Sequence, residues 1–202
     1  SDRIKVSRQA TQLSLAELIN CVELSENQYV RQVALEAIAA KRDEGGVNYL
    51  LHLLQKSDPH GRSQIIVALG QSGFQRVYNY LLPFVMDPSI EISTSAIKAL
   101  ERINATNRSH VIEILRKNTS NWQNHIFEPL VKLKNRILSV SSSKKLLGSL
   151  LLRDRILSEE QLEMALLIQK RFPLLLGQVL RHLEYVSIAD IQKSVACQKN
   201  IS

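Results

Sequence analysis

The chain has 202 residues, 45% of them hydrophobic, so it is long and apolar enough to bury a core and is not an intrinsically disordered chain. Its formal net charge is +7, but residues 139–202 hold nine Lys and Arg against six Asp and Glu, and the remainder holds 17 against 13. The basic excess is therefore spread over the chain. A nucleic-acid surface is usually a clustered stripe, so we do not expect nucleic acid as the partner.

Cysteine content and apolar runs bear on the compartment. Cys21 and Cys197 are the two cysteines, which excludes a disulfide framework or a cysteine metal cluster, and we expect both to be small buried residues. No apolar run reaches the ~18 residues of a membrane span, and the N-terminal Ser-Asp-Arg-Ile-Lys is unlike a signal peptide. We expect a cytoplasmic protein and, because the first residue is not Met, a piece of a longer one.

Helix-forming residues dominate the composition. Aromatic residues make up only 5%, and the apolar residues are mostly Leu, Ile, Val and Ala, a mix that favours helix over strand. Three stretches, 30–38, 61–69 and 92–100, align at a spacing of 31 residues. The aligned positions are small residues, which let helices approach closely, and large apolar residues beside them: Ala37, Ala68 and Ala99, and Ile38, Leu69 and Leu100.

Each aligned stretch is followed by a second apolar stretch, which predicts the second helix of a hairpin. These second helices are expected over 47–54, 77–85 and 111–115, and a half-repeat is expected at the front over 15–24. Breakers between helices are expected at Gly45-Gly46, Asp58-Pro59, Gly73 and Asp87-Pro88. An Asp ahead of a helix also supplies a cap for unsatisfied N–H groups.

This series of hairpins resembles HEAT-like repeats from Ser14 to Leu138. The resemblance implies an all-α solenoid over residues 1–138, in which each hairpin buries its apolar face only against the next. It also implies a concave surface that binds another macromolecule, and we expect that macromolecule to be a protein.

A different repeat follows a serine-rich linker, which we place at 139–143. Leu147-Gly148 and Leu176-Gly177 begin two copies, offset by 29 residues, that fill residues 144–202. Each copy predicts a short helix, a turn, a Ser N-cap and a second helix. In the first copy Ser158 and Gln161 are spaced as a capping box.

The tandem copies resemble the N-terminal (MshEN-type) domain of type II secretion and type IV pilus assembly ATPases. That pattern has Arg-Leu-Gly, aliphatic pairs, an internal Gly and a closing Gln at fixed spacing. The first copy matches at Leu147, Gly148, Leu151, Leu152, Ile156, Leu157, Leu162, Leu166 and Gln169. The second matches at Leu176, Gly177, Leu180, Tyr185, Val186, Ile191, Val195 and Gln198. The resemblance implies a docking domain. No motor activity is expected, because the chain lacks a Gly-rich phosphate loop.

Some members of that family bind cyclic di-GMP, which gives an alternative function and the one ligand that the resemblance suggests. The residues concerned would be Leu147, Gly148, Leu151, Arg155, Gln169, Leu176, Gly177, Leu180 and Gln198. The family's Arg, which stacks on guanine and neutralises phosphate, is replaced here by Leu146 and Leu175, and its internal Gly by Arg155 and Glu184. We therefore expect weak or no nucleotide binding, with core packing and docking as the main roles of the motif.

Catalytic and metal-binding patterns are missing from the sequence. The five histidines lack metal-ligand spacing, and no Gly-x-Ser-x-Gly is present. Trp122, with Arg116, Lys117 and His125 nearby, could serve nucleic acid or an acidic peptide, but we expect it to close the end of the solenoid.

Three functional hypotheses follow. The leading one is a non-enzymatic adaptor without cofactor or metal, in a bacterial secretion, pilus or exopolysaccharide system. The second is the cyclic di-GMP receptor. A third, an enzyme or chaperone-lyase of the HEAT-like kind, would need an acidic or aromatic pocket on the concave face, and the sequence shows no such cluster.

Overall fold

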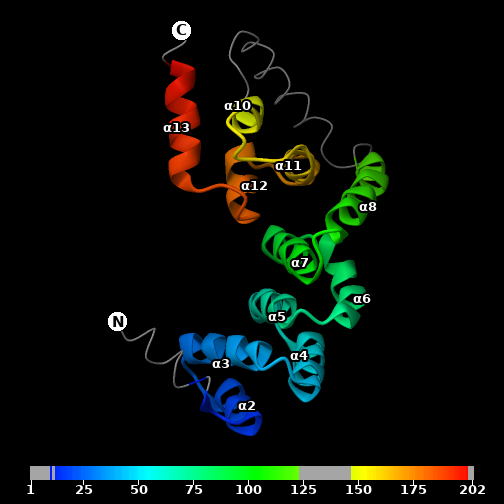
Figure 1. Ribbon diagram of the computed structural model, residues 1–202. Coiled ribbons are helices and arrows are strands. Elements are labelled where there is room, and N and C mark those ends of the chain that lie inside the picture. Colours follow the sequence, from blue (N-terminus) through cyan, green and yellow to red (C-terminus); the bar gives the residue numbers. More distant parts are fainter. Residues whose placement is uncertain (1–9, 11, 123–146, 200–202) are drawn as a thin grey trace. The chain divides into compact units, whose positions relative to one another are not determined.

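In a computed structural model of the protein, residue 10 and residues 12–122 and 147–199 are described, and every regular element in them is a helix (Figure 1). The predicted all-α fold is therefore confirmed. The chain divides into two compact units, Ser1–Arg108 and Ser109–Ser202. Each unit is taken by itself below.

The first unit is a series of helical hairpins. Its elements are α2 (Leu15–Leu24), α3 (Gln28–Ala40), α4 (Glu44–Lys56), α5 (Pro59–Ser72), η1 (Gln75–Val77), α6 (Tyr78–Leu81), η2 (Leu82–Met86) and α7 (Ile90–Ile103). Helices α3, α5 and α7 pack side by side in one layer, while α4 and the η1–α6–η2 segment pack on that layer as the second (Figure 1). The predicted front half-repeat is confirmed as α2, which packs against α3.

The 31-residue register is confirmed by burial. Ala37, Ala68 and Ala99 are 6%, 1% and 2% exposed, and each lies in the first helix of its hairpin. The closest approach lies two residues further along α5 than Ala68. A β-carbon added at Gly70 would lie 2.6 Å from both Cα and Cβ of Ala99. Small residues therefore let the backbones of α5 and α7 touch.

Polar side chains fix where the helices begin. The side chains of Asp43 and Asp58 accept hydrogen bonds from the N–H groups of Gly46 at 3.0 Å and Gly61 at 2.7 Å, which satisfies donors that the first turn leaves unpaired. Pro59 follows Asp58 at the first helical position, as expected. At its other end α5 stops at Gly73, which has a left-handed φ of 71° that favours glycine.

One of the expected helix breaks, at Gly45-Gly46, is wrong. Gly45 and Gly46 lie in the first turn of α4, because Asp43 starts the helix ahead of them and the chain turns at Arg42 instead, with φ at 49°. Gly46 serves close packing, since an added β-carbon would lie 3.0 Å from Cγ2 of Ile38. The break expected at Asp87-Pro88 is confirmed between η2 and α7, but Asp87 accepts from the N–H of Ser89 at 2.8 Å and so orders the turn without capping the helix.

The second helix of the middle hairpin differs from the predicted continuous helix over 77–85. It consists of a 3₁₀ turn, one turn of α-helix and a second 3₁₀ turn. Pro83 explains the break, because it lacks an N–H group and its ring clashes with the carbonyl four residues earlier. The buried side chains Val77, Leu81 and Val85 still recur every four residues and face the core.

The second unit begins inside α8 (Asn107–Trp122), whose predicted core of 111–115 is confirmed as part of a longer helix. Its other described helices are α10 (Leu147–Arg153), α11 (Glu159–Arg171), α12 (Leu176–His182) and α13 (Ile188–Lys199). The predicted linker at 139–143 lies outside the described residues, so the domain boundary remains a prediction.

Candidate interaction surfaces

In both C-terminal copies the first helix ends in the same type of turn. In α10 the N–H of Ile156 donates to the carbonyl of Leu151 at 2.9 Å and that of Arg155 to Leu152 at 3.0 Å. This is a Schellman motif, and Arg155 has the left-handed φ of 56° that the motif requires. In the second copy, 29 residues later, Tyr185 donates to Leu180 at 3.0 Å and Glu184, with φ at 58°, donates to Arg181 at 2.9 Å. The turn is therefore retained at both positions where the resemblance calls for glycine.

The start of the second helix in each copy is also repeated. Ser158 and Gln161 form the predicted capping box at α11, with bonds of 3.2 and 2.9 Å. In the second copy Ser187 caps α13, and its hydroxyl donates to Asp190 at 2.6 Å. These hydrogen bonds hold the pKa of Asp190 below its usual value.

The two Leu-Gly pairs contact each other reciprocally. A β-carbon added at Gly148 would lie 3.5 Å from Cδ2 of Leu176, and one added at Gly177 would lie 3.6 Å from Cδ2 of Leu147. Each glycine also faces the second helix of its own copy: Leu162 Cδ1 at 2.9 Å from the first, Ile191 Cδ1 at 3.5 Å from the second. Such mutual contacts are what a two-fold arrangement of the copies requires. The open side of each glycine is therefore occupied by the protein's own leucine and isoleucine side chains.

The remaining residues of the predicted nucleotide site are divided between core and surface. Leu151 and Leu180 are fully buried. Arg155 is exposed at its turn, and the side-chain amide of Gln169 donates to the carbonyl of Leu174 at 3.0 Å. The side chain of Gln198 lies outside the described residues. Of the described members of the set, the two leucines therefore serve the core and Gln169 makes a hydrogen bond within the chain.

An open hollow lies elsewhere in this unit, at the start of the second copy. It has a volume of about 230 Å³ and is lined by Leu174, Gln178, Arg181 and His182. The sequence pattern does not single out these side chains. In a sequence they look like any exposed polar residues at a helix end.

Several basic residues near the motif are already engaged. Arg153 donates to Asp154 at 2.8 Å, and this hydrogen bond lowers the pKa of the Asp154 carboxyl. Arg171 is only 4% exposed, and its guanidinium lies 5.0 Å from the centre of the Phe172 ring. Neither is placed to stand in for an anchoring arginine at the start of α10 or α12.

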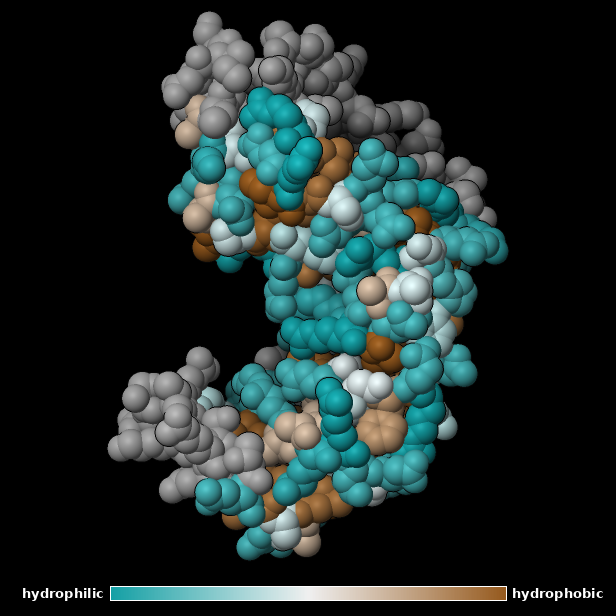
Figure 2. All heavy atoms as spheres, in the orientation of Figure 1, coloured by the Kyte–Doolittle hydropathy of each residue, from teal (hydrophilic) through white to brown (hydrophobic). Residues whose placement is uncertain are grey.

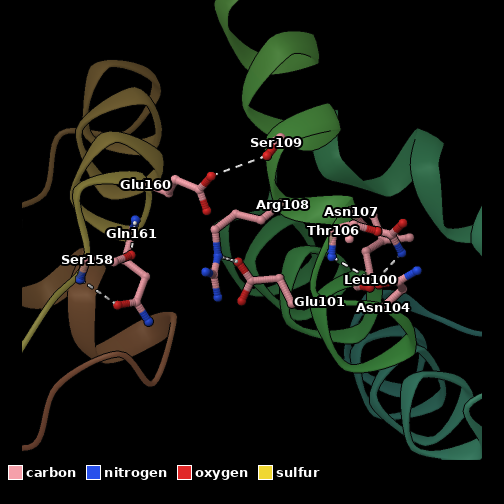
Figure 3. A network of polar contacts seen from close by, with 10 residues as sticks. All are labelled: Leu100, Glu101, Asn104, Thr106, Asn107, Arg108, Ser109, Ser158, Glu160 and Gln161. Atoms are coloured by element: carbon pink, nitrogen blue, oxygen red, sulfur yellow. Dashed lines mark hydrogen bonds and ion pairs between the residues drawn. The ribbon is translucent and has the colours of Figure 1, made fainter.

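Helix α8 joins the second unit through polar contacts with α11. The hydroxyl of Ser109 donates to Glu160 at 3.3 Å, as Figure 3 shows, and Arg116 donates to Glu163 at 2.6 Å. Lys117 pairs with Glu113 at 2.7 Å. The cations expected beside Trp122 therefore contact carboxylates of this unit. The side chain of Trp122 and the whole of His125 lie outside the described residues.

Within the described ranges, no cluster of three His, Cys, Asp or Glu residues could hold a metal ion. Those ranges also contain no helix with the length and apolar character needed to cross a membrane. Cys21 is a free, half-buried thiol, less buried than expected, and the side chain of Cys197 is not described.

The fold of the first unit places it among the α-solenoids built from helical hairpins. Comparison with known families identifies HEAT repeats over residues 15–101, which cover α2 to α7. No curated protein and no solved structure matches the chain. The chain therefore carries HEAT-like repeats, a repeat type that is characteristic of protein-interaction scaffolds.

Proposed function

We propose that this protein is a non-catalytic adaptor, which binds one protein through its HEAT-like unit and docks a second through its C-terminal tandem repeat. The stacked hairpins over residues 15–101 carry the first half of this proposal. Each hairpin adds surface on both layers, so the stack offers a long face on which a partner can be recognised at several points. Figure 2 shows hydrophilic residues over most of one face, with hydrophobic residues visible in small areas between them.

The docking role of the C-terminal unit rests on its resemblance to the N-terminal domain of secretion and pilus ATPases. The paired left-handed turns at Arg155 and Glu184 support this resemblance, because a non-glycine residue adopts such a φ only where the surrounding turn demands it. The proposal extends to a bacterial secretion, pilus or exopolysaccharide system as the setting. An adaptor for such a system would bind a cytoplasmic or membrane-platform component.

Cyclic di-GMP binding is the alternative for the same unit, and the retained turns favour it. Two observations oppose it: the faces of Gly148 and Gly177 are filled by side chains, and one anchor position is Leu175, which is 69% exposed and uncharged. A charge-assisted phosphate contact is worth about 1.5–3 kcal/mol. Losing two of them weakens a micromolar site by roughly two to four powers of ten.

Isothermal titration of the full chain with cyclic di-GMP separates the two functions. We expect no binding tighter than about 0.1 mM for the unmodified protein. The Leu146→Arg, Leu175→Arg double variant should gain affinity if the backbone keeps the family geometry. Low-micromolar binding by the unmodified protein would favour the nucleotide receptor over the docking domain.

A further inference from the structure

We propose that the second layer of the middle hairpin, residues 74–86, is a docking strip for an acidic linear peptide of the protein partner. This inference rests on the proposed adaptor function and specifies the chemistry of what the HEAT-like unit binds. The strip has an aromatic ring at each of its two ends, Phe74 and Phe84, with an arginine held against each ring and exposed uncharged side chains between them.

The first end of the strip is set by Arg76. Its guanidinium carbon lies 5.7 Å from the centre of the Phe74 ring, and its Nη2 donates to the side-chain oxygen of Asn48 in α4 at 3.0 Å. The other end is set by Arg62 of α5, whose guanidinium carbon lies 6.0 Å from the Phe84 ring and whose Nη2 donates to the carbonyl of Ser57 at 3.0 Å.

Both guanidiniums are oriented, yet neither meets a carboxylate among the described residues. A guanidinium has five N–H donors, and the ring and the single neutral acceptor satisfy only part of that capacity. Arg153, Arg108 and Arg116 differ, because each of these pairs with an acid. Arg62 and Arg76 are thus ordered cations whose planar forks remain available for a carboxylate.

The charge of the surrounding segment points the same way. Residues 45–86 contain Lys56, Arg62 and Arg76 but one acidic residue, Asp58. The Asp58 carboxylate caps α5 by accepting from Gly61 at 2.7 Å, so it is already engaged. The segment therefore carries a net positive charge, which favours anionic partners.

The middle of the strip, between its two ends, consists of exposed side chains. Gln75, Asn79, Tyr80 and Pro83 are exposed and recur at the spacing of one helical face, and Tyr80 is 54% exposed. A tyrosine with one apolar face and a polar tip is a common anchor in protein interfaces. Between Phe74 and Phe84 the helical rise amounts to about 15–20 Å. An extended peptide covers that distance with about five or six residues.

The expected ligand is therefore a peptide with two acidic residues about five or six positions apart and an apolar residue between them. Flat aromatic and proline surface favours the apolar residue, and the paired arginines fix the register through the acids. Nucleic acid fits less well, because phosphates repeat more closely than this spacing and the chain lacks a continuous basic stripe.

The test uses the full chain and fluorescein-labelled peptides of about twelve residues, measured by fluorescence anisotropy. The probe carries two Glu residues six positions apart with a Leu between them, and its control carries Gln in place of both Glu residues. The variants Arg62→Gln and Arg76→Gln should each weaken binding of the Glu probe about tenfold, and Tyr80→Ser about threefold or more. Lys117→Gln, which removes the same charge from α8, should change it less than twofold.

Circular dichroism shows whether each variant keeps its fold, and Tyr80→Ser keeps the test informative because that side chain is exposed. The proposal would be overturned if Lys117→Gln weakened binding as much as the arginine variants do, or if the Gln control peptide bound as tightly as the Glu probe. It would also be overturned if a polynucleotide displaced the probe equally well from the wild type and from the Tyr80→Ser variant. A photo-crosslinking residue at Tyr80 and at Gln71 of α5 separates this proposal from the adaptor function. Protein adducts at Gln71 with no binding of the Glu probe would leave the adaptor and remove the docking strip.

Discussion

The contact between Gly70 and Ala99 sets the spacing of α5 and α7, and Gly70→Ala tests it. The added β-carbon would lie 2.6 Å from Cα and Cβ of Ala99 and 3.2 Å from its carbonyl oxygen, whereas carbon atoms pack at about 3.5–4.0 Å. Two of the three atoms belong to backbone, so rotamer changes cannot relieve the clash, and the helices must separate by about 1 Å. A gap of this size forfeits a quarter to a half of the dispersion energy along the contact.

The magnitude follows from two opposing effects. Overpacking of a close contact costs about 1–3 kcal/mol, and the upper end applies here because the backbone must move. Alanine gains about 1 kcal/mol over glycine in a helix. The net expectation is a loss of about 2 kcal/mol, or roughly 4–8 °C in melting temperature for a chain of this length.

Urea unfolding followed by circular dichroism measures this loss, and Gly177→Ala is the matched control, because its added β-carbon meets nothing closer than 3.5 Å. Combining Gly70→Ala with Ala99→Gly removes the clash with Cβ of residue 99 but leaves the clash with its Cα. The double variant should therefore recover about half of the stability that Gly70→Ala loses. A Gly70→Ala protein as stable as the wild type, or more stable by the helix-propensity gain, would refute the close approach.

Three further predictions concern the C-terminal copies. Arg155→Gly should stabilise the protein by about 0.5–1 kcal/mol in urea unfolding, because glycine relieves the left-handed φ at some cost in unfolded-state entropy, and Arg155→Ala should give no gain. Ser194→Ala should stabilise the protein by about 1 kcal/mol and so raise its melting temperature, because the Ser194 hydroxyl is buried without a hydrogen bond in the described residues. Ala165 fills the equivalent place in the first copy. A lower melting temperature would show that the hydroxyl is paired. The pKa of Asp190 is lowered in the folded protein, so its contribution to stability is fully present above the ordinary value of 3.8 and is lost as pH falls through the lower folded value. In acid titration, the stability of Asp190→Asn should therefore depend less on pH than that of the wild type. Identical acid transitions of the two proteins would contradict the cap with Ser187.

Much of the first unit could be predicted because its repeat shows in the sequence as small residues that recur at a fixed spacing. Small residues at Ala37, Ala68 and Ala99 are required wherever a layer of helices packs closely, so their spacing fixes the register. The errors came from residues with more than one use. Gly45 and Gly46 look like a break, but Asp43 starts a helix ahead of them, and Gly46 serves the contact with Ile38.

The candidate site was harder to predict than the fold. The motif at Gly148 and Gly177 could mean either close packing or approach to a ligand, since both need a missing β-carbon, and only the positions of Leu162 and Ile191 distinguish them. The ordered guanidinium of Arg76 gives no sequence signal, because its ring and its amide acceptor come from different elements. Their pairing depends on how one hairpin stacks on the next.

The most direct test of the adaptor function is site-specific photo-crosslinking of the full chain in extracts of its source cells, with benzoylphenylalanine at Gln71 in α5 or Asn79 in α6, two exposed positions of the HEAT-like unit. Adducts are identified by mass spectrometry, and the same residue at Lys170 reports on the C-terminal unit. The adaptor function predicts discrete protein adducts from the HEAT-like unit that include a protein not captured at Lys170. An absence of protein adducts at both HEAT-like positions, with capture confined to Lys170, would contradict it.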